Sequence, residues 1–460
     1  MQKHGRSACT SVLVGKEASI NGSVMIARNE DCKTAWPKKL AFYKKNSQPD
    51  QFKSKDNDFF LELPDESYAF NATPEWTDKY GVFLEDGFNE KKVAMSATES
   101  AYANSRVLGL DPFDEEHGIL EEAMVSVVLP YVKTAKEGVK RLGKIVTNHG
   151  AAEANGILFA DPKEAWYMEI GSGHHYVAMR IPDDSYAVVA NQLSIQEIEF
   201  KSKDFITSPG LAKFIEDNKL WPKGKKVNWR EIFGTHDDQD LHYNTPRVWV
   251  GQKILNPSIE QNPQSFDLPF IRQAEKPISA DDVQTILGNH YENTPYDLVS
   301  KSGKASFRPI GIATTQESHV LEVSDKNLVH WLAMGVASQS VYIPFFPQGA
   351  TTPIMFERGT DKYDPESAYW IFKAAGVLVD RSWKKYQPLL RKTQTATKIE
   401  LAKIRRHYEQ LGANDDQALA DRANSELAQT AIDKYRDLIS ELISAQTADS
   451  PLMYRVDPDL

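Results

Sequence analysis

Two short apolar runs near the amino terminus predict a β-hairpin. The runs are residues 12–14 and 24–27, and an Asn-Gly pair lies between them. Asn-Gly between two apolar runs is the strongest short-range signal for a hairpin. The strands of a hairpin are antiparallel, so the start of the first strand lies beside the end of the second. The pattern therefore predicts that Cys9, Arg28 and Asp31 meet at one end of a sheet.

Further apolar runs predict a second group of strands. The segment from 156 to 191 contains four short runs separated by tight turns, and the last two are 175–181 and 186–191. Pro-Asp-Asp between these two has the chemistry of a turn. Four successive strands of this kind favour one antiparallel meander. Other strands are predicted at 93–97, 318–322 and 329–334.

Apolar residues at helical spacing predict helices between and after these strands. The segment 115–134 predicts one helix that is broken at Pro130, with a second short helix after it. Helix starts are predicted at Thr245, before Pro246, and at Ser279. From Asp364 onward the pattern is helical and ends in a charged tail. Because strands and helices are interspersed, one large α+β domain is favoured over two.

The composition is that of an ordinary globular protein with an acidic balance. The 460 residues carry a formal net charge of -10, which argues against a nucleic-acid backbone as partner. No apolar stretch reaches the length of a membrane span, and residues 1–8 lack the apolar core of a secretory signal. Cys9 and Cys32 are too few for a disulfide framework and fit a reducing compartment. The sequence therefore predicts a cytoplasmic protein that binds neither nucleic acid nor membrane, with Cys32 a buried bystander.

Cys9 is the leading candidate for chemistry, although a lone cysteine is more often a small buried hydrophobe. Small residues, Ser7 and Ala8, precede it, so a cut before Cys9 is sterically easy. Removal of residues 1–8 would leave Cys9 with both a thiol and a free α-amine. Such an amine has a pKa near ~8 and can take the thiol proton, while a nearby cation favours the thiolate. An N-terminal residue that is nucleophile and base together is a recognised catalytic arrangement.

Four other residues carry both a structural and a functional interpretation. Arg28 and Asp31 follow an apolar strand, which favours a half-buried strand end over a solvated ion pair. Asn191 also ends an apolar strand, where Asn is ordinarily a turn residue, but its amide can donate to an oxyanion. Arg247 follows a proline at a helix start, where the ordinary interpretation is a surface residue.

The sequence contains no metal, nucleotide or serine-hydrolase pattern. His174 and His175 are adjacent and so lie on opposite faces of a strand, and no HExxH or spaced Cys/His set occurs. The Gly-Ser-Gly at 171–173 lacks the helix that a phosphate loop needs, and Gly-x-Ser-x-Gly is absent. We therefore expect no cofactor and no metal.

Several stretches are specific enough to compare with known families. They are 9–16 (Cys-Thr-Ser-Val-Leu-Val-Gly-Lys), 23–31 (Ser-Val-Met-Ile-Ala-Arg-Asn-Glu-Asp), 87–91, 97–100, 174–184, 290–297, 331–344 and 369–372. They resemble a bacterial family of cysteine dipeptidases, peptidase family C69, and the resemblance spans nearly the whole chain. It implies an N-terminal-nucleophile hydrolase with a four-layer αββα sandwich of two antiparallel sheets. It also implies hydrolysis of dipeptides, with broad side-chain tolerance and without a metal.

The resemblance also implies a division of the chain and a role for each candidate residue. The expected parts are a propeptide at 1–8, a catalytic domain at 9–380, and a helical C-terminal extension at 381–460. By the wider pattern shared with choloylglycine hydrolases and penicillin V acylases, Cys9 is the nucleophile. Arg28 tunes the thiolate and Asp31 holds the α-amine. Asn191 corresponds to an Asn that supports the oxyanion, and Arg247 is a loose match to a later active-site Arg.

One position departs from that pattern. The acylases place another Asn after the strand at 93–97, and this chain has Thr98 and Glu99 there. A backbone N–H would then be the second oxyanion donor, and Glu99 is a candidate to receive the α-amine of a dipeptide substrate. Two alternatives stay open: an amidase acting on N-acyl substrates such as penicillin V or conjugated bile acids, and a non-catalytic, secernin-like binding protein. A homo-oligomer is also left open.

Overall fold

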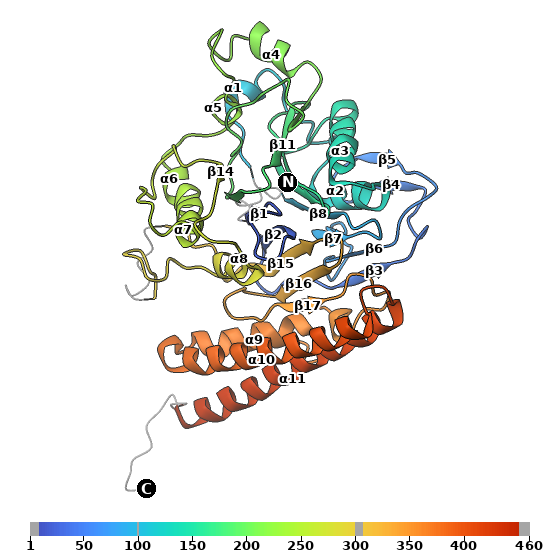
Figure 1. Ribbon diagram of the computed structural model, residues 1–460, viewed down its shortest axis with the longest axis vertical. Coiled ribbons are helices and arrows are strands. Elements are labelled where there is room, and N and C mark those ends of the chain that lie inside the picture. Colours follow the sequence, from blue (N-terminus) through green and yellow to red (C-terminus); the bar gives the residue numbers. More distant parts are fainter. Residues whose placement is uncertain (1–8, 99–100, 300–306, 450–460) are drawn as a thin grey trace.

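Two stacked antiparallel sheets form the centre of a computed structural model that describes residues 9–98, 101–299 and 307–449 (Figure 1). The seven-stranded sheet contains, in spatial order, β14 (Ile271–Arg272), β12 (Tyr186–Val189), β1 (Thr10–Val14), β2 (Val24–Asp31), β15 (Thr315–Val323), β16 (Leu328–Met334) and β17 (Ile343–Phe345). The six-stranded sheet contains β13 (Phe205–Thr207), β11 (Tyr176–Ile181), β10 (Ala165–Ile170), β9 (Asn155–Ala160), β8 (Ala94–Thr98) and β7 (Asp86–Phe88). Two small pairs are β3 (Ala41–Tyr43) with β6 (Phe70–Ala72) and β4 (Gln51–Lys53) with β5 (Phe60–Glu62).

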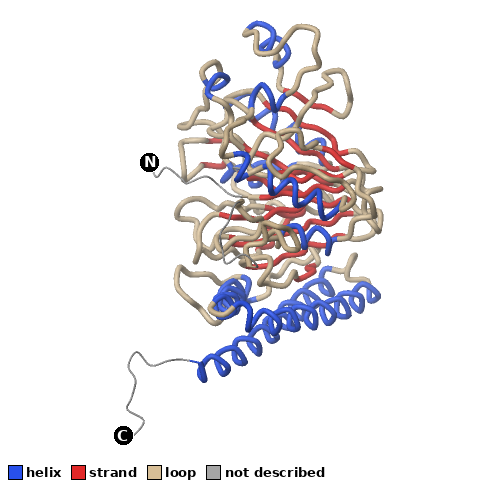
Figure 2. The backbone as a smooth tube through the Cα atoms, turned by 90° about the vertical axis from the view of Figure 1, so that its left-hand side faces the viewer, coloured by secondary structure: helices blue, strands red, loops and turns tan. Residues whose placement is uncertain are grey.

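Helices cover the outer faces of both sheets. The helices are α1 (Ser105–Leu108), α2 (Glu121–Val128), α3 (Ala135–His149), α4 (Leu211–Asp217), α5 (Trp229–Phe233), α6 (Asp240–Tyr243), α7 (Thr245–Leu255), α8 (Ala280–Leu287), α9 (Ala368–Asp380), α10 (Trp383–Leu411) and α11 (Gln417–Asp449), with 3₁₀ turns η1 (Leu129–Tyr131) and η2 (Ile354–Phe356). One apolar core joins α2 and α3 to the six-stranded sheet, and another joins α7 and α8 to the seven-stranded sheet. A third core lies between the two sheets. Figure 2 shows the strands stacked at the centre, so the predicted αββα sandwich is confirmed.

The predicted N-terminal hairpin is present and lies at the middle of the seven-stranded sheet. β1 pairs antiparallel with β2, and Ser11 lies opposite Arg28. Gly22 in the connecting turn has a φ of 74°, a conformation that glycine adopts without a steric penalty. Because each strand alternates its side chains, one face of this hairpin contacts the other sheet and the opposite face contacts the helices. The hairpin therefore contributes to the core between the two sheets and to the core between the seven-stranded sheet and its helices.

The predicted four-stranded meander is wrong in its last strand. β9, β10 and β11 pair in succession in the six-stranded sheet, as expected. β12 instead pairs with β1 in the other sheet, with Ser11 opposite Val189. The turn at 182–184 therefore connects the two sheets. It packs tightly against Gly15, where a Cβ atom would lie only 2.3 Å from the carbonyl oxygen of Pro182. This sheet change brings the end of β12, and Asn191 after it, to the side of β1.

Some helix boundaries also differ from the predictions. The helix expected across 115–134 begins only at Glu121, and Pro130 lies in the 3₁₀ turn that follows it. The next helix, α3, has 15 residues and is not short. Asn244, and not Thr245, occupies the cap position of α7. The start at Ser279 is confirmed by a capping box with Asp282.

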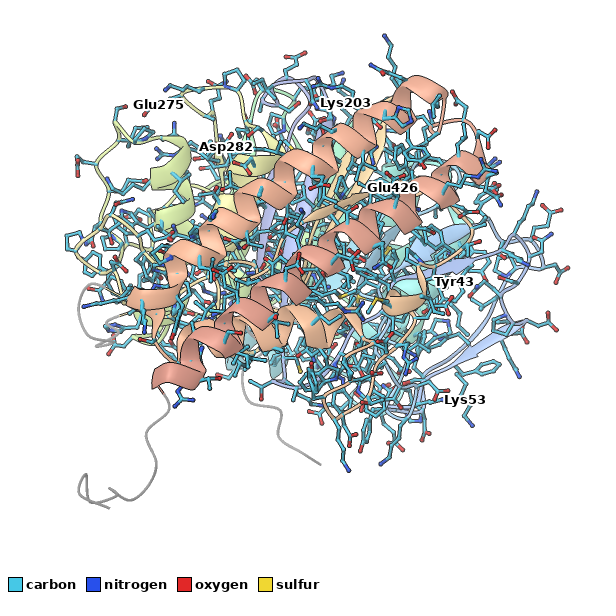
Figure 3. The ribbon with its side chains drawn as sticks, turned by 90° about the horizontal axis from the view of Figure 1, so that it is seen from below. Tyr43, Lys53, Lys203, Glu275, Asp282 and Glu426 are labelled. Carbon is cyan, nitrogen blue, oxygen red and sulfur yellow. The ribbon has the colours of Figure 1, made fainter. Side chains whose placement is uncertain are left out.

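The three C-terminal helices pack together beside the sandwich. Their apolar residues form a core with β16 and β17, the edge of the seven-stranded sheet. Figure 3 shows α10 and α11 running side by side across this side of the molecule. Among the described residues, no helix combines the length and the apolar character that crossing a membrane requires.

Candidate active site

Cys9 lies directly before β1 and is buried, with 1% of its surface exposed. Its Sγ atom is 3.5 Å from Nη1 of Arg28 and 3.6 Å from Oε2 of Glu30. The pairing of β1 with β2 produces these contacts, because residues 28 and 30 are next to the start of β1 and share one face of β2. The structure therefore brings together a thiol, a guanidinium and a carboxylate.

Three side chains besides Cys9 hold the Arg28 guanidinium in place. Nη1 donates to Glu30, Nη2 donates to Oε2 of Glu85 at 2.8 Å, and Nε donates to Oγ of Ser96 at 2.9 Å. The spacing of Glu30 from Arg28 is visible in the sequence, since residues i and i+2 of a strand share a face. Glu85 and Ser96 come from 57 and 68 residues further along the chain, and no local pattern indicates that they belong to this site.

The electrostatics around Cys9 oppose its ionisation in the uncut chain. Burial and the carboxylate of Glu30 raise the pKa of the thiol well above its ordinary value, and Arg28 only partly offsets them. Burial and the neighbouring Glu85 also raise the pKa of Glu30, to about 8. Glu85 itself is held ionised, since Lys38 and Arg28 outweigh its burial and lower its pKa. A thiol in these surroundings needs a base close by if it is to react near neutral pH.

Asp31 lies at the end of β2, and its carboxylate contacts a second arginine. Oδ2 accepts a hydrogen bond from Nη2 of Arg308 at 2.8 Å, and Oδ1 accepts one from the hydroxyl of Thr315. Burial raises the pKa of Asp31, although Arg308 and Thr315 oppose that shift. The negative charge of Asp31 also raises the pKa of Cys9, so the two residues are within electrostatic reach. Sequence reasoning missed Arg308, which lies 277 residues after Asp31.

Arg247 joins Asn191 to the backbone of Cys9. Nη1 donates to the carbonyl oxygen of Cys9 at 2.8 Å and to Oγ1 of Thr10 at 2.9 Å. Nη2 donates to Oδ1 of Asn191 at 2.7 Å. Arg247 is fully buried and not a surface residue, and burial together with Arg308 lowers its pKa to about 9. The structure thus brings Arg247 and Asn191 to the same end of β1 as Cys9.

The contacts of Asn191 fix the orientation of its amide. Because Oδ1 accepts from Arg247, the amide nitrogen Nδ2 points the other way. Nδ2 is buried and donates to no acceptor among the described residues. A buried donor without an acceptor costs free energy, and such groups are expected where a ligand or a reacting atom completes the bond. Asn191 therefore offers one donor to an oxyanion formed near Cys9.

The structure describes one of the two predicted substrate-binding residues, Thr98, and its role in binding stays a prediction. Thr98 is the last residue of β8 and is fully buried. Its Oγ1 is buried without a hydrogen-bond partner among the described residues. Glu99 lies outside the described residues, so the expectation that it receives an α-amine stays a prediction.

Cys32, expected to be buried, is exposed, because β2 ends one residue earlier.

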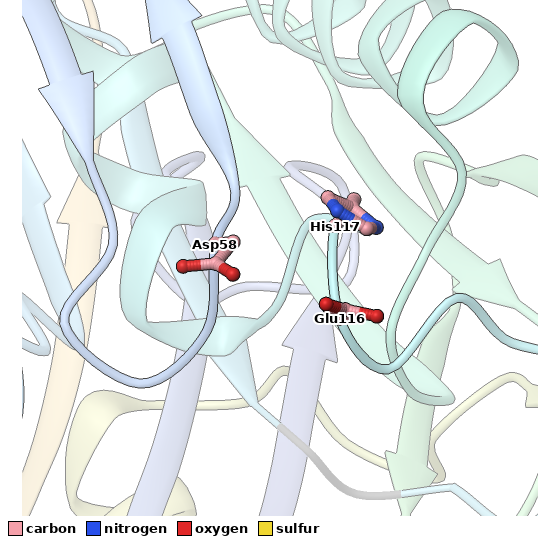
Figure 4. Close-up of side chains that lie close together, drawn as sticks. All are labelled: Asp58, Glu116 and His117. Atoms are coloured by element: carbon pink, nitrogen blue, oxygen red, sulfur yellow. The ribbon is translucent and has the colours of Figure 1, made fainter.

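Three groups of side chains bring possible metal ligands within 4.8 Å of one another in the described part of the chain. The exposed group is Asp58, Glu116 and His117, and Figure 4 shows it on two adjacent surface loops. A backbone hydrogen bond from Asp58 to Glu116 explains why these loops meet. Exposed acidic groups are common without an ion, so this group carries no assignment. The two other groups, Glu30/Glu85/Glu121 and Asp86/Glu317/His319, are largely buried around and behind Arg28.

A large cavity lies away from Cys9. It has a volume of about 890 Å³ and is lined by residues that include Phe70, Phe88, Asp325 and Asn414. Phe88 ends β7 and Asp325 lies in the β15–β16 turn, so the cavity is at the opposite end of the strands from Cys9. None of the candidate site residues lines it.

Sequence comparisons connect the whole chain to one group of proteins. The family model "Peptidase family C69" matches residues 8–396. A protein named "Probable dipeptidase" from Latilactobacillus sakei is 40% identical, with 99% of this chain and 98% of the relative covered. A protein named "Dipeptidase A" from Lactobacillus helveticus is 33% identical, with 95% and 96% covered.

Among solved structures, the similarity is weaker. A penicillin V acylase from Agrobacterium tumefaciens shares 16% identity at a TM-score of 0.35, covering 73% of this chain and 86% of its own. A variant of the conjugated bile acid hydrolase from Clostridium perfringens shares 11% identity at a TM-score of 0.31, covering 71% and 89%.

Proposed function

Because the chain belongs to peptidase family C69, we propose that it hydrolyses dipeptides with the thiol of Cys9 as nucleophile, once residues 1–8 have been removed. The names of the relatives support the dipeptide as substrate. The single observation that carries the choice of nucleophile is the position of the Cys9 Sγ atom, 3.5 Å from Nη1 of the buried Arg28. Cys32, the other thiol of the chain, is exposed and follows the end of β2.

Removal of the leader uses the same thiol. Sγ of Cys9 attacks the carbonyl carbon of Ala8, so that an S–C bond forms while the C–N bond to Cys9 breaks. The Cys9 nitrogen takes up the proton that the thiol gives away. Water then cleaves the thioester, which releases residues 1–8 and leaves Cys9 with a free thiol and a free α-amine.

The new α-amine supplies the base that the buried thiol needs. An α-amine has an ordinary pKa near ~8, so roughly a tenth of it is unprotonated at neutral pH and can accept the thiol proton. The Arg28 guanidinium beside Sγ stabilises the thiolate. Asp31, which is held by Arg308 and Thr315, is proposed to hold the α-amine in its catalytic position.

Hydrolysis of the dipeptide follows in two steps. The thiolate attacks the peptide carbonyl carbon, and Nδ2 of Asn191 donates to the oxyanion that forms. A backbone N–H is the second donor. The protonated α-amine gives its proton to the leaving amino acid as the C–N bond breaks. Water, deprotonated by the same amine, then cleaves the thioester and restores the thiol.

The acidic surroundings of Cys9 support a substrate with a free amino terminus. Carboxylate oxygens of Glu30, Glu85 and Glu121 lie within 4.8 Å of one another. Burial raises the pKa of Glu121 well above its ordinary value, and the charges of Glu30 and Glu85 raise it further. An ammonium group bound nearby would favour the ionised forms of these acids, whereas a neutral acyl group would not. We propose that Glu99 adds to this recognition of the α-amine.

Cys9 and Cys32 are not joined in a disulfide, which is compatible with a reducing compartment, so we also propose a cytoplasmic location. This part of the proposal can be tested by fractionation of cells that express the protein at its natural level. The dipeptidase activity does not depend on the outcome.

Intact mass and turnover of two cysteine variants test the proposed nucleophile. Wild-type protein is expected to lack residues 1–8 and to hydrolyse dipeptides. Cys9→Ala is expected to keep the leader and to lose at least about 1000-fold in kcat/KM. Cys32→Ser is the matched control and is expected to retain both cleavage and turnover, because its thiol is exposed beyond the end of β2. Full activity of uncut wild-type protein, or preference for N-acyl amides over dipeptides, would contradict the proposal.

A further inference from the structure

A line of buried polar side chains runs behind Arg28, between the two sheets. Nε of Arg28 donates to Oγ of Ser96 at 2.9 Å, and the same hydroxyl oxygen lies 3.1 Å from Nε2 of His319. Arg28 and His319 are cross-strand neighbours on β2 and β15. Ser96 and Asp86 are cross-strand neighbours on β8 and β7 of the other sheet. The line therefore passes from sheet to sheet and begins at the residue that contacts the Cys9 thiol.

The far side of His319 is held by two carboxylates. Nδ1 lies 2.9 Å from Oδ2 of Asp86 and 3.0 Å from Oε1 of Glu317. All of these side chains are fully buried. Although burial lowers the pKa of His319, the charges of Asp86 and Glu317 raise it to about 9, so the ring is an imidazolium at neutral pH. The two histidines facing Asp86 outweigh its burial and hold its pKa well below the ordinary value.

His330 completes the set of groups around Asp86, and its contact with Asn71 indicates the tautomer of its ring. Oδ1 of Asn71 accepts from the backbone N–H of Phe88 at 2.8 Å, so Nδ2 of Asn71 faces Nδ1 of His330 at 3.3 Å. Since Nδ1 then accepts, the ring proton is on Nε2, which lies 3.2 Å from Oδ2 of Asp86. Asp86 thus has a nitrogen of each histidine within 3.2 Å of its Oδ2 atom, and of the two histidines His319 is the one that leads toward Arg28.

Burying so many charged groups between two sheets is costly, and an apolar packing of the same volume is often as stable. The retained geometry has one evident consequence for the site. Glu30 and Glu85 accept hydrogen bonds from the two Nη atoms of Arg28. Within the described part of the chain, only the bond from Nε to Ser96 fixes the third side of the guanidinium. The His319 ring fixes Ser96 in turn, and Asp86 and Glu317 hold the ring from its other side.

We propose that Ser96, His319 and Asp86 are positioning residues for the peptidase reaction, holding the Arg28 guanidinium against the sulfur of Cys9. The proposal assumes that Cys9 is the nucleophile. The titratable groups that face His319 are Asp86 from β7, Glu317 from β15 itself and, through Ser96, Arg28 from β2. His330 from β16 faces Asp86 from the other side.

The test is the pH dependence of Cys9 alkylation by iodoacetamide, followed on the Cys9 peptide by mass spectrometry so that Cys32 does not contribute. Ser96→Ala removes the link and keeps the charge, while His319→Gln keeps hydrogen-bonding groups and removes the charge. Each is expected to raise the midpoint of alkylation by about one pH unit, which lowers the thiolate fraction roughly tenfold below the midpoint. kcat/KM should fall by a similar factor through kcat, with KM little changed. His330→Gln is the matched control and should leave the midpoint in place.

A double variant tests whether Ser96 and His319 act on Arg28 through one another or independently. If the three residues act through one another, Ser96→Ala combined with His319→Gln should shift the midpoint no further than the larger single shift. Ser96→Ala loses one hydroxyl and no ion pair, so it keeps the proposal testable even if His319→Gln fails to fold. An unshifted midpoint in folded Ser96→Ala would overturn the proposal. A stoichiometric divalent ion in the purified protein would overturn it too, since the ion would replace the proton on Nδ1 of His319.

A wrong assignment of Cys9 as the nucleophile can be distinguished from a wrong assignment of the positioning residues. If Cys9→Ala kept its turnover, the assignment of Cys9 would be wrong, but the alkylation midpoints would still report whether the line of residues acts on its thiol.

Discussion

The inner face of the seven-stranded sheet is apolar in one half and charged in the other. On β2, Val24 and Ile26 belong to the core between the sheets, whereas Arg28 and Glu30, further along the same face, surround Cys9. β15 runs in the opposite direction and repeats the division, with Val323 and Leu321 apolar and His319 and Glu317 charged. On the facing sheet, β8 changes from Ala94 to Ser96.

The two halves of this face therefore have different roles: one stabilises the fold and the other forms the site around Cys9. The apolar half stabilises the stack of sheets through burial, which is the dominant favourable contribution to folding. The charged half must overcome the desolvation of its ionised groups and holds its charges in pairs and hydrogen bonds. Substitutions in the apolar half should therefore change the free energy of unfolding and leave the chemistry intact, whereas those in the charged half should change both.

The largest combined loss of stability and activity is expected for Arg28→Met. The variant leaves the buried carboxylates of Glu30 and Glu85 without one of their cations, so the free energy of unfolding should fall by about 3–5 kcal/mol. The Cys9 thiolate also loses its neighbouring charge, and kcat/KM should fall at least about 100-fold. Urea unfolding and dipeptide hydrolysis measure the two effects.

Arg180→Met is the control for Arg28→Met. Arg180 on β11 is partly exposed and also pairs with two carboxylates, Glu164 and Asp183, so its loss should cost less than about 1 kcal/mol and leave turnover unchanged. Equal losses in the two variants would show that burial of the charge is not what matters.

Asn191→Ala should reduce catalysis more than stability. Loss of one oxyanion donor is expected to lower kcat by about 10²–10³-fold with little change in KM. Arg247 keeps its bonds to the Cys9 carbonyl and Asn244, so the fold should tolerate the change. Asn256→Ala is the matched control: Asn256 is equally buried but has partners for both amide atoms, Tyr186 and the Gln273 carbonyl. If both variants kept the wild-type kcat, Asn191 would not bind the oxyanion.

Leu321→Ala examines the apolar half of the same strand that carries His319. Leu321 is fully buried in the core between the sheets, so its truncation should lower the free energy of unfolding by about 3 kcal/mol through lost burial and a cavity. The kcat of the folded protein should stay within about twofold of wild type, since kcat depends on the site and not on the global stability. A large loss of kcat in fully folded protein would mean that the two halves are not independent.

Local sequence patterns were sufficient for the parts of the site that lie on one hairpin. The Asn-Gly turn and the two apolar runs predicted that Cys9 and Arg28 meet, and β1 and β2 pair as expected. The pattern also identifies the Asn at the end of β12 as a candidate, but it does not predict the pairing of β12 with β1 that brings this Asn near Cys9. A turn at 182–184 has the same local chemistry whether the next strand stays in its sheet or crosses to the other, because long-range pairing decides between them.

The residues behind Arg28 could not be predicted for the same reason. Glu85, Ser96 and His319 reach Arg28 or Ser96 from 57 to 223 residues away, through the register of four strands and the stacking of two sheets. Taken singly, a serine in an apolar strand or a histidine next to apolar neighbours predicts nothing about chemistry. Only the folded arrangement shows that these polar residues contact one another in a line. Polar residues in otherwise apolar strands conflict with the local pattern, and such conflicts are expected at functional sites.

The effect that is expected to develop only gradually concerns the pH dependence of the charged half. His319 has a folded pKa raised to about 9 against an ordinary 6.5, so its contribution to stability is complete below pH 6.5 and is lost as the pH rises toward 9. The loss should be no more than about 3.4 kcal/mol, at 1.36 kcal/mol for each of the 2.5 units between 6.5 and 9. Glu30, with a pKa raised to about 8, makes stability fall with pH as well, so wild-type protein alone does not isolate His319. The difference in unfolding free energy between wild type and His319→Gln should therefore be measured, and it should shrink between pH 6.5 and 9. A difference that stays constant over this range would mean that the ring is neutral in the folded protein, and that its link to Ser96, and not its charge, is what acts on Arg28.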